Sequence, residues 1–251
     1  MAEQVLMEKV CLITGASRGI GAAIARALAK QGIRIAINYL TSEKAALQIQ
    51  EQLSCQGAEV LAIKADVSQG EDVERMFAIV EERFGHIDFL INNAGISYRG
   101  LLTDTTEEQW QKIMDTNLKG PFLCSKRALP AMIRKKSGRI INIASVWGLY
   151  GASCECAYAA SKGGLISLTK SLAKEVGPSG ITVNAIAPGA IATDMLNREL
   201  QPKDKEDLVE QIPADRLGFP EEIAGACVFL LSPSAAYING QVISIDGGWK
   251  V

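Results

Sequence analysis

The stretch TGASRGIG, residues 14–21, follows a short apolar run and leads directly into an alanine-rich helical pattern. Glycines at these positions let the backbone turn tightly, approach a pyrophosphate group and pack a helix against a strand. The helix that follows supplies N–H groups and a positive dipole, which bind anions. The spacing G-x-x-x-G-x-G differs from the standard G-x-G-x-x-G fingerprint, and glycines at such a turn are often merely structural. The stretch therefore predicts a strand-to-helix turn, and a dinucleotide site only if polar residues elsewhere join it.

Short β-branched runs and longer helical patterns alternate along the whole chain. Strands are expected at residues 10–14, 33–38, 60–64, 89–92, 139–144, 181–187 and 242–245, and helices at 20–31, 43–53, 72–83, within 107–135, at 158–176 and at 221–231. About seven strands separated by helices imply a parallel sheet covered on both faces, because right-handed crossovers put helices on each side. The sequence predicts one α/β domain over residues 1–251, a doubly wound (Rossmann) fold whose ligand site lies at the carboxyl ends of the strands.

Residues 190–213 interrupt this alternation, because the segment is long, polar and broken by Pro202 and Pro213 without an evident role in the sheet. Long loops of this kind often close over substrates. We therefore predict a substrate lid at residues 190–213, and the alternative is a surface excursion.

Composition and charge narrow the possible partners. The chain has 251 residues, 48% of them hydrophobic, and a net charge of -2, so no basic excess attracts it to nucleic acid or an anionic membrane. Its six cysteines are scattered through apolar segments, which is typical of reduced cytosolic thiols. Cys154 and Cys156 lack companion ligands, so we expect no metal site. Without a signal peptide or membrane span in the sequence, we expect a cytoplasmic protein with a small or carrier-bound substrate.

Two further polar clusters follow predicted strands. Asp66 and Val67 come after the third strand, and NNAG, residues 92–95, completes the fourth. The carboxyl ends of parallel strands meet at one edge of the sheet, where the adenine and ribose of a dinucleotide bind. Because a purely structural role of the glycines leaves both clusters unexplained, the sequence predicts a dinucleotide site.

Charge near the second strand indicates which dinucleotide binds. NAD sites usually place an acid on the adenosine ribose about 20 residues past the glycines, whereas the second strand here ends in Asn38 and Tyr39. Arg18 lies inside the glycine loop, where a guanidinium meets a 2′-phosphate in a charge-assisted contact. These residues favour NADPH, and the alternative is that Arg18 is only a solvated loop cation.

Three side chains suggest carbonyl chemistry. Tyr158 and Lys162 lie four apart in a helical pattern and so share one face. A neighbouring ammonium stabilises the phenolate, which makes Tyr158 a usable general acid. Ser145 ends the fifth predicted strand at the same sheet edge, where its hydroxyl is able to hydrogen-bond a substrate carbonyl and the developing oxyanion. Taken singly, such a pair is most often an ordinary surface pair, and such a serine a turn or capping residue.

Taken together, these motifs resemble those of the classical short-chain dehydrogenase/reductase family, and the resemblance covers nearly the whole chain. The motifs that carry the resemblance are TGASRGIG (14–21), DV (66–67), NNAG (92–95), Asn117, Ser145, YAASK (158–162), PG (188–189) and DGG (246–248). The resemblance implies a catalytic tetrad of Asn117, Ser145, Tyr158 and Lys162. Lys162 would also hold the nicotinamide ribose, and Asn117 would support a proton relay through water.

The same resemblance extends to the cofactor and the assembly. It assigns Ile191 and Thr193 to the nicotinamide carboxamide, and it implies a homotetramer formed through the helices around Asn117 and Tyr158 and the last strand. The residues expected to contact the cofactor are Gly15, Ser17, Arg18, Gly19, Ile20, Gly21, Asn38, Tyr39, Asp66, Val67, Asn93, Ala94, Gly95, Tyr158, Lys162, Pro188, Gly189, Ile191 and Thr193.

Within the family the chain looks most like the 3-oxoacyl-[acyl-carrier-protein] reductases, which share ASRGIG, the Asn-Tyr end of the second strand and a mobile lid. Acyl carrier protein is acidic and docks on cations beside the active-site mouth. By resemblance the docking pair falls at Lys136 and Ser179, so only one of the two positions is basic here.

A smaller group of relatives is also similar. Residues 146–155 (VWGLYGASCE) and 247–249 (GGW) resemble the elongation factor P 5-aminopentanone reductases, which reduce a ketone attached to a lysine of that factor. The carboxylate of Glu155 would suit the cationic amine of that substrate. The equally good alternative is that Glu155 is only a helix-start carboxylate stabilised by the helix dipole. A function of another class, a non-catalytic NADPH sensor, has no need for Ser145, Tyr158 and Lys162 together.

Overall fold

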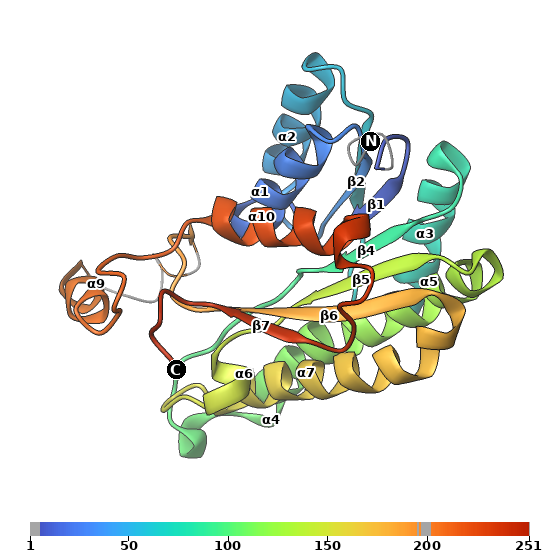
Figure 1. The fold of residues 1–251 in the computed structure, drawn as a ribbon. Helices are drawn as coiled ribbons and strands as arrows, with labels where there is room; N and C mark the ends of the chain where they lie inside the picture. The colour runs from blue at the N-terminus through green and yellow to red at the C-terminus, as the bar shows by residue number, and fades with distance from the viewer. Residues whose placement is uncertain (1–5, 195, 197–201, 251) are drawn as a thin grey trace.

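The computed structural model describes residues 6–194, 196 and 202–250. Seven parallel strands form one sheet in the order β3-β2-β1-β4-β5-β6-β7 (Figure 1). The strands are β1 (Val10–Ile13), β2 (Arg34–Tyr39), β3 (Val60–Lys64), β4 (Phe89–Asn92), β5 (Gly138–Ile143), β6 (Ile181–Pro188) and β7 (Val242–Ile245). The strand order reverses between β1 and β4, which is where ligands bind in open α/β sheets. The predicted doubly wound fold is confirmed.

Helices cover both faces of the sheet, because its central strands are apolar on both sides. The helices are α1 (Gly19–Ala29), α2 (Glu43–Cys55), α3 (Gly70–Phe84), α4 (Glu107–Met114), α5 (Gly120–Lys135), α6 (Trp147–Tyr150), α7 (Cys156–Val176), α9 (Pro202–Val209) and α10 (Pro220–Leu231). Helices α1, α2 and α10 pack on one face, and α3, α5 and α7 pack on the other (Figure 1). Within the described ranges, no helix has the length and apolar character needed to cross a membrane.

The helical pattern predicted within residues 107–135 is interrupted. α4 ends at Met114, residues Asp115–Lys119 form a turn of π-helix, and α5 begins at Gly120. A Cβ atom at Gly120 would lie 2.9 Å from Val67 Cγ2, so α5 starts in close contact with the segment after β3. Turns of π-helix often occur at functional sites, and this one contains Asn117. Periodicity alone did not predict it.

Two short helices lie outside the predicted elements. α6 follows β5, and α9 falls within the predicted lid, on the carboxyl side of the sheet (Figure 1). Residues 195 and 197–201 of the predicted lid lie outside the described residues. A closing movement of residues 190–213 therefore stays a prediction.

A row of buried polar side chains connects α7 to the sheet. Asn92 Nδ2 donates to Asn142 Oδ1 at 2.8 Å, and Asn142 Nδ2 donates to Thr169 Oγ1 at 2.8 Å. Thr169 in turn donates to the carbonyl of Leu165 on its own helix. Buried polar groups of this kind are costly to leave unpaired. The row therefore fixes how α7 lies against β4 and β5, and with it Lys162 and Tyr158, about two and three turns earlier on α7.

Candidate active site

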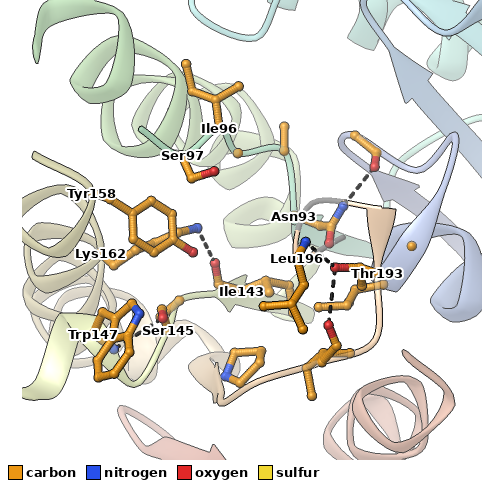
Figure 2. A pocket seen from close by; sticks show the side chains of 18 of the residues that line it. Asn93, Ile96, Ser97, Ile143, Ser145, Trp147, Tyr158, Lys162, Thr193 and Leu196 are labelled. Atoms are coloured by element: carbon orange, nitrogen blue, oxygen red, sulfur yellow. Dashed lines mark hydrogen bonds between the residues drawn. The ribbon is translucent and has the colours of Figure 1, made fainter. Parts of the chain in front are cut away.

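The ends of strands β1 to β6 surround a cavity of about 910 Å³ at the carboxyl edge of the sheet (Figure 2). Its walls come from the glycine loop, the segments after β2 to β6, the start of α7, α9 and the C-terminal residues. Every residue expected at the cofactor lines this cavity, and so do Ser145, Tyr158 and Lys162. Asn117 is fully buried beside the cavity and is not among the residues that line it.

Amide side chains from neighbouring strands hold the glycine loop. Gly15 N donates to Asn38 Oδ1 at 3.2 Å, and Asn93 Nδ2 donates to the carbonyls of Thr14 and Gly15, each at 2.9 Å. A Cβ atom at Gly15 would lie 2.7 Å from Ala94 Cα, and one at Gly21 would lie 2.5 Å from Asn93 Nδ2. Side chains at these two positions would therefore push the loop away from the end of β4.

The start of α1 fits a bound pyrophosphate. Arg18 occupies the N-cap position, but its side chain makes no capping hydrogen bond, and the first turn of α1 contains no acid. Backbone N–H groups at a helix N-terminus lack partners within the helix and favour anions. The site consequently has the donors that a dinucleotide phosphate needs.

Asn38 lies at the end of β2 and lines the cavity, as expected, but its side chain is buried. The side chain is 2% exposed, and its Nδ2 donates to the carbonyl of Ala65 at 2.9 Å while Oδ1 accepts from Gly15. Asn38 therefore holds the glycine loop, and the charge argument applies to the exposed residues beyond Tyr39. Thr41 and Ser42 line the cavity there, and Arg18 Nη1 donates to Ser42 Oγ at 3.2 Å. These two hydroxyl residues were not predicted at the site, although their position shortly after β2 indicates the adenosine end of a dinucleotide site.

Asp66 has a fixed orientation at the end of β3. Its Oδ1 accepts from both the backbone N–H and the hydroxyl of Ser68, at 2.9 and 2.7 Å, and its own N–H donates to Asp72. The hydrogen bond from Asp66 N lowers the pKa of Asp72, so that carboxylate stays ionised. Asp66 and Val67 thus occupy a rigid part of the cavity wall.

Lys162 is a buried cation at the centre of the site. The residue is 4% exposed, and its Nζ donates to the Ile143 carbonyl at 2.8 Å (Figure 2). Burial lowers the pKa of Lys162 to about 8, because a charged ammonium is poorly solvated there. Its Nζ lies 5.7 Å from the centre of the Tyr158 ring, one helical turn earlier on α7. The predicted pairing of these two side chains is present.

Ser145 follows β5 and faces the same space (Figure 2). It is 7% exposed, and its Oγ accepts from Trp147 N at 3.2 Å. A hydroxyl that accepts one hydrogen bond still has its own proton to donate. Ser145 is therefore arranged to donate to an oxygen atom in the cavity.

Asn117 supports the cavity wall through hydrogen bonds and does not line the cavity. Its Oδ1 accepts from Ile96 N at 2.9 Å, and its Nδ2 donates to the Ile96 carbonyl and to Ser161 Oγ. A Cβ atom at Gly95 would lie 3.4 Å from both Asn117 Oδ1 and Lys162 Nζ. The side chain of Asn117 thus fixes the segment after β4 against α7 and does not itself reach the cavity.

The wall beyond Ser145 is aromatic and charged. Trp147 and Trp249 pack edge to face with ring centres 4.8 Å apart, and Lys250 Nζ lies 5.2 and 4.6 Å from the two indole centres. Glu155 lines the cavity at the N-cap position of α7, and its side chain makes no capping hydrogen bond. This position fits both interpretations of Glu155, a helix-start carboxylate stabilised by the dipole and a carboxylate that faces the substrate.

The expected docking pair lies elsewhere. Lys136 ends α5 and Ser179 precedes β6, so both lie at the amino edge of the sheet, opposite the cavity. They are close together, because a Cβ atom at Gly180 would lie 2.6 Å from the Lys136 carbonyl oxygen. Within one chain these residues are not beside the cavity mouth, contrary to expectation.

A glycine loop at the switch point, beside a buried lysine, a tyrosine and a serine, defines a nicotinamide dinucleotide-dependent oxidoreductase. No cluster of metal-ligating side chains occurs in the described part of the chain. A sequence model of the family described as enoyl-(acyl carrier protein) reductase matches residues 15–250. The chain belongs to the short-chain dehydrogenase/reductase family.

Individual relatives agree with this membership. The 3-oxoacyl-[acyl-carrier-protein] reductase FabG of Staphylococcus epidermidis is 45% identical over 242 residues, 96% of this chain and 99% of that protein. The uncharacterized oxidoreductase YmfI of Bacillus subtilis is 42% identical over 244 residues, 97% of this chain and 99% of that protein. A crystal structure from Agrobacterium tumefaciens, described as a "putative gluconate dehydrogenase", has a TM-score of 0.93 and 36% identity, and covers 98% of this chain and 97% of its own.

Replacing Lys162 by Met tests its burial. The pKa of Lys162 falls from its ordinary 10.5 to about 8 in the folded protein, so between these pH values the unfolded chain binds the proton and the folded protein does not. Stability of the wild type then rises with pH in this window, by about 1.4 kcal/mol per pH unit relative to the Met variant. Urea unfolding without cofactor at pH 7 to 10 measures the difference. A difference that does not change with pH would contradict the burial argument.

Proposed function

We propose that this protein reduces a ketone to a secondary alcohol with NADPH, and that the ketone belongs to a 3-oxoacyl chain on an acyl carrier protein. The observation that carries the proposal is one continuous cavity in which the glycine loop is joined to Tyr158, Lys162 and Ser145. The carrier-bound substrate is supported by relatives named 3-oxoacyl-[acyl-carrier-protein] reductase, at 45 and 44% identity.

The proposed roles follow from the contacts of each side chain. When bound, NADPH supplies the hydride that adds to the carbonyl carbon. Tyr158 donates a proton to the carbonyl oxygen, and the buried ammonium of Lys162 stabilises the phenolate that remains. Ser145 donates a hydrogen bond to the same oxygen as negative charge develops on it. Asn117 holds the segment after β4 against α7, through Ile96 and Ser161.

The cofactor is proposed to lie along the residues predicted for it. Its pyrophosphate would meet the start of α1, its adenosine would lie near Asp66, and its nicotinamide would lie between Pro188 and Thr193. Arg18, Thr41 and Ser42 would meet the 2′-phosphate that distinguishes NADPH from NADH, since residues 40–42 carry no acid that would repel it.

The proton-donor role is tested by Tyr158→Phe. Turnover should fall by about 10²–10⁴, because the change removes the proton donor, while NADPH affinity measured by fluorescence titration stays near the wild-type value. Tyr237→Phe, at an exposed tyrosine outside the cavity, is the matched control and should retain full activity. A Tyr158→Phe rate within about tenfold of wild type would remove Tyr158 from the mechanism.

The cofactor preference is tested by Arg18→Ala. The value of kcat/KM for NADPH should fall about tenfold or more, since a charge-assisted contact is lost, and the value for NADH should change little. Arg26→Ala, two turns further along α1, provides the control because Arg26 hydrogen-bonds Gln52 and does not line the cavity. Equal losses with both cofactors, or a wild type that prefers NADH, would refute the assignment.

A second substrate is favoured by the wall beyond Ser145. Glu155 places a carboxylate in the same cavity as Trp147 and Trp249. The indole faces themselves are covered by the ammonium of Lys250, so Glu155 is the group that favours a cation. A ketone that carries an amine, such as the aminopentanone attached to elongation factor P, would meet this carboxylate. A non-catalytic NADPH sensor would use neither Glu155 nor Tyr158.

Glu155→Gln separates the two substrates. We expect the ratio of kcat/KM for an amino-ketone over a neutral ketone of the same length to fall by roughly fivefold, since a partly screened ion pair is worth about 1 kcal/mol. Glu82→Gln, which is exposed and outside the cavity, should leave the ratio unchanged. An unchanged ratio for Glu155→Gln would leave the acyl thioester as the substrate.

We also propose a homotetramer. Large apolar side chains are exposed on the helices that the assembly would use, including Trp110 on α4, Phe122 and Ile133 on α5, and Tyr150 on α6. Contiguous exposed apolar surface often marks an interface between chains. Sedimentation in solution gives the state directly.

A further inference from the structure

An ion pair lies at the base of the segment that is proposed to face the nicotinamide. Arg216 Nη1 and Nη2 donate to Glu222 Oε2 and Oε1 at 2.8 and 2.7 Å, and Glu222 Oε2 also accepts from Phe219 N at 2.8 Å. Arg216 Nη1 further donates to the Leu217 carbonyl, and its guanidinium lies 5.5 Å from the Phe219 ring centre. These contacts hold residues 216–219 as one rigid turn before α10.

That turn is hydrogen-bonded to the segment after β6. Gly218 N donates to the Ala190 carbonyl and Ala192 N donates to the Gly218 carbonyl, both at 2.9 Å, so Gly218 bridges the residues on both sides of Ile191. A Cβ atom at Gly218 would lie 2.6 Å from Ile191 Cδ1 and 3.7 Å from Glu222 Oε2. The position of the ion pair is therefore transmitted to Ile191 through direct contacts.

The same segment leads to the glycine loop. Thr193 Oγ1 donates to the Ile191 carbonyl, and a Cβ atom at Gly19 would lie 3.5 Å from Thr193 Cγ2. Residues 190–193 thus occupy the space between the turn at 216–219 and the start of α1. A shift of the turn would change the gap in which the nicotinamide half of the cofactor is proposed to bind.

We propose that Arg216 and Glu222 are positioning residues for the nicotinamide half of the cofactor. They act through Gly218 on Ile191 and Thr193, and they do not touch the cofactor. Exposed ion pairs contribute little to stability, but a bidentate pair has a defined geometry. The inference rests on the proposed function, because Ile191 and Thr193 are placed at the nicotinamide only there.

The alternative is a simple helix cap, since Glu222 also accepts from the backbone N–H of Phe219, the N-cap residue of α10. Glu222→Gln separates the two roles. Glutamine is still able to accept from Phe219 N and so keeps the cap, but it loses the charged bidentate contact with Arg216. Arg216→Lys is the second variant, because it leaves Glu222 and its cap intact while removing the planar fork.

The experiment is a titration of each variant with NADPH and, separately, with 2′,5′-ADP, which has the adenosine half of the cofactor without the nicotinamide. We expect both variants to bind NADPH about fivefold or more weakly and to bind 2′,5′-ADP as the wild type does. The control is Arg127→Lys, at an equivalent bidentate contact with Glu81 beside Phe77, far from the cavity. It should leave both affinities unchanged.

Two results would overturn the inference. Equal weakening of both ligands would mean that the pair supports the fold as a whole, and unchanged affinity for both would leave only a helix cap. Both ligands bind without a ketone, so these results do not depend on which substrate is reduced. Failure of the proposed function would appear separately, as an absence of ketone reduction by the wild type.

Discussion

The contact between Lys162 Nζ and the Ile143 carbonyl is the constraint on which the site depends. Burying an ammonium group costs free energy unless the group is hydrogen-bonded. The hydrogen bond to Ile143 forms only when α7 and β5 lie in the right position relative to each other. The buried row from Asn92 through Asn142 to Thr169 supplies that support. Burial of the Lys162 ammonium lowers the free energy of unfolding, as the lowered pKa of Lys162 shows, but it places a cation beside Tyr158.

The cofactor side of the cavity depends on the same sheet edge. Strands β1 to β6 all end there, and residues beyond several of these ends hold neighbouring segments in place. Asn93 holds the glycine loop, and Asn117 holds the segment after β4 against α7. The arrangement brings the glycine loop, Ser145, Tyr158 and Lys162 to one cavity. In the proposed function, the wall formed by Trp147, Trp249 and Glu155 distinguishes between substrates.

Much of this was predictable from sequence. The strands are continuous apolar runs with regular spacing, so their number and the doubly wound fold followed from periodicity, and TGASRGIG marked the switch point. Features that depend on contacts between distant segments were not predictable. The inward orientation of Asn38 requires β3 beside it, and the π-turn at Asn117 requires Ser161 and Ile96. The packing of Trp147 on Trp249 joins residues far apart in the sequence.

The proposed function requires this cavity to transfer a hydride from NADPH to a ketone. The most direct measurement is a single turnover with NADPH deuterated at both C4 positions and an acetoacetyl thioester, followed by mass spectrometry of the product. One deuterium is expected on the carbon that was the ketone. Consumption of NADPH with a product that lacks deuterium at this carbon, or no turnover with any ketone tested, would contradict it.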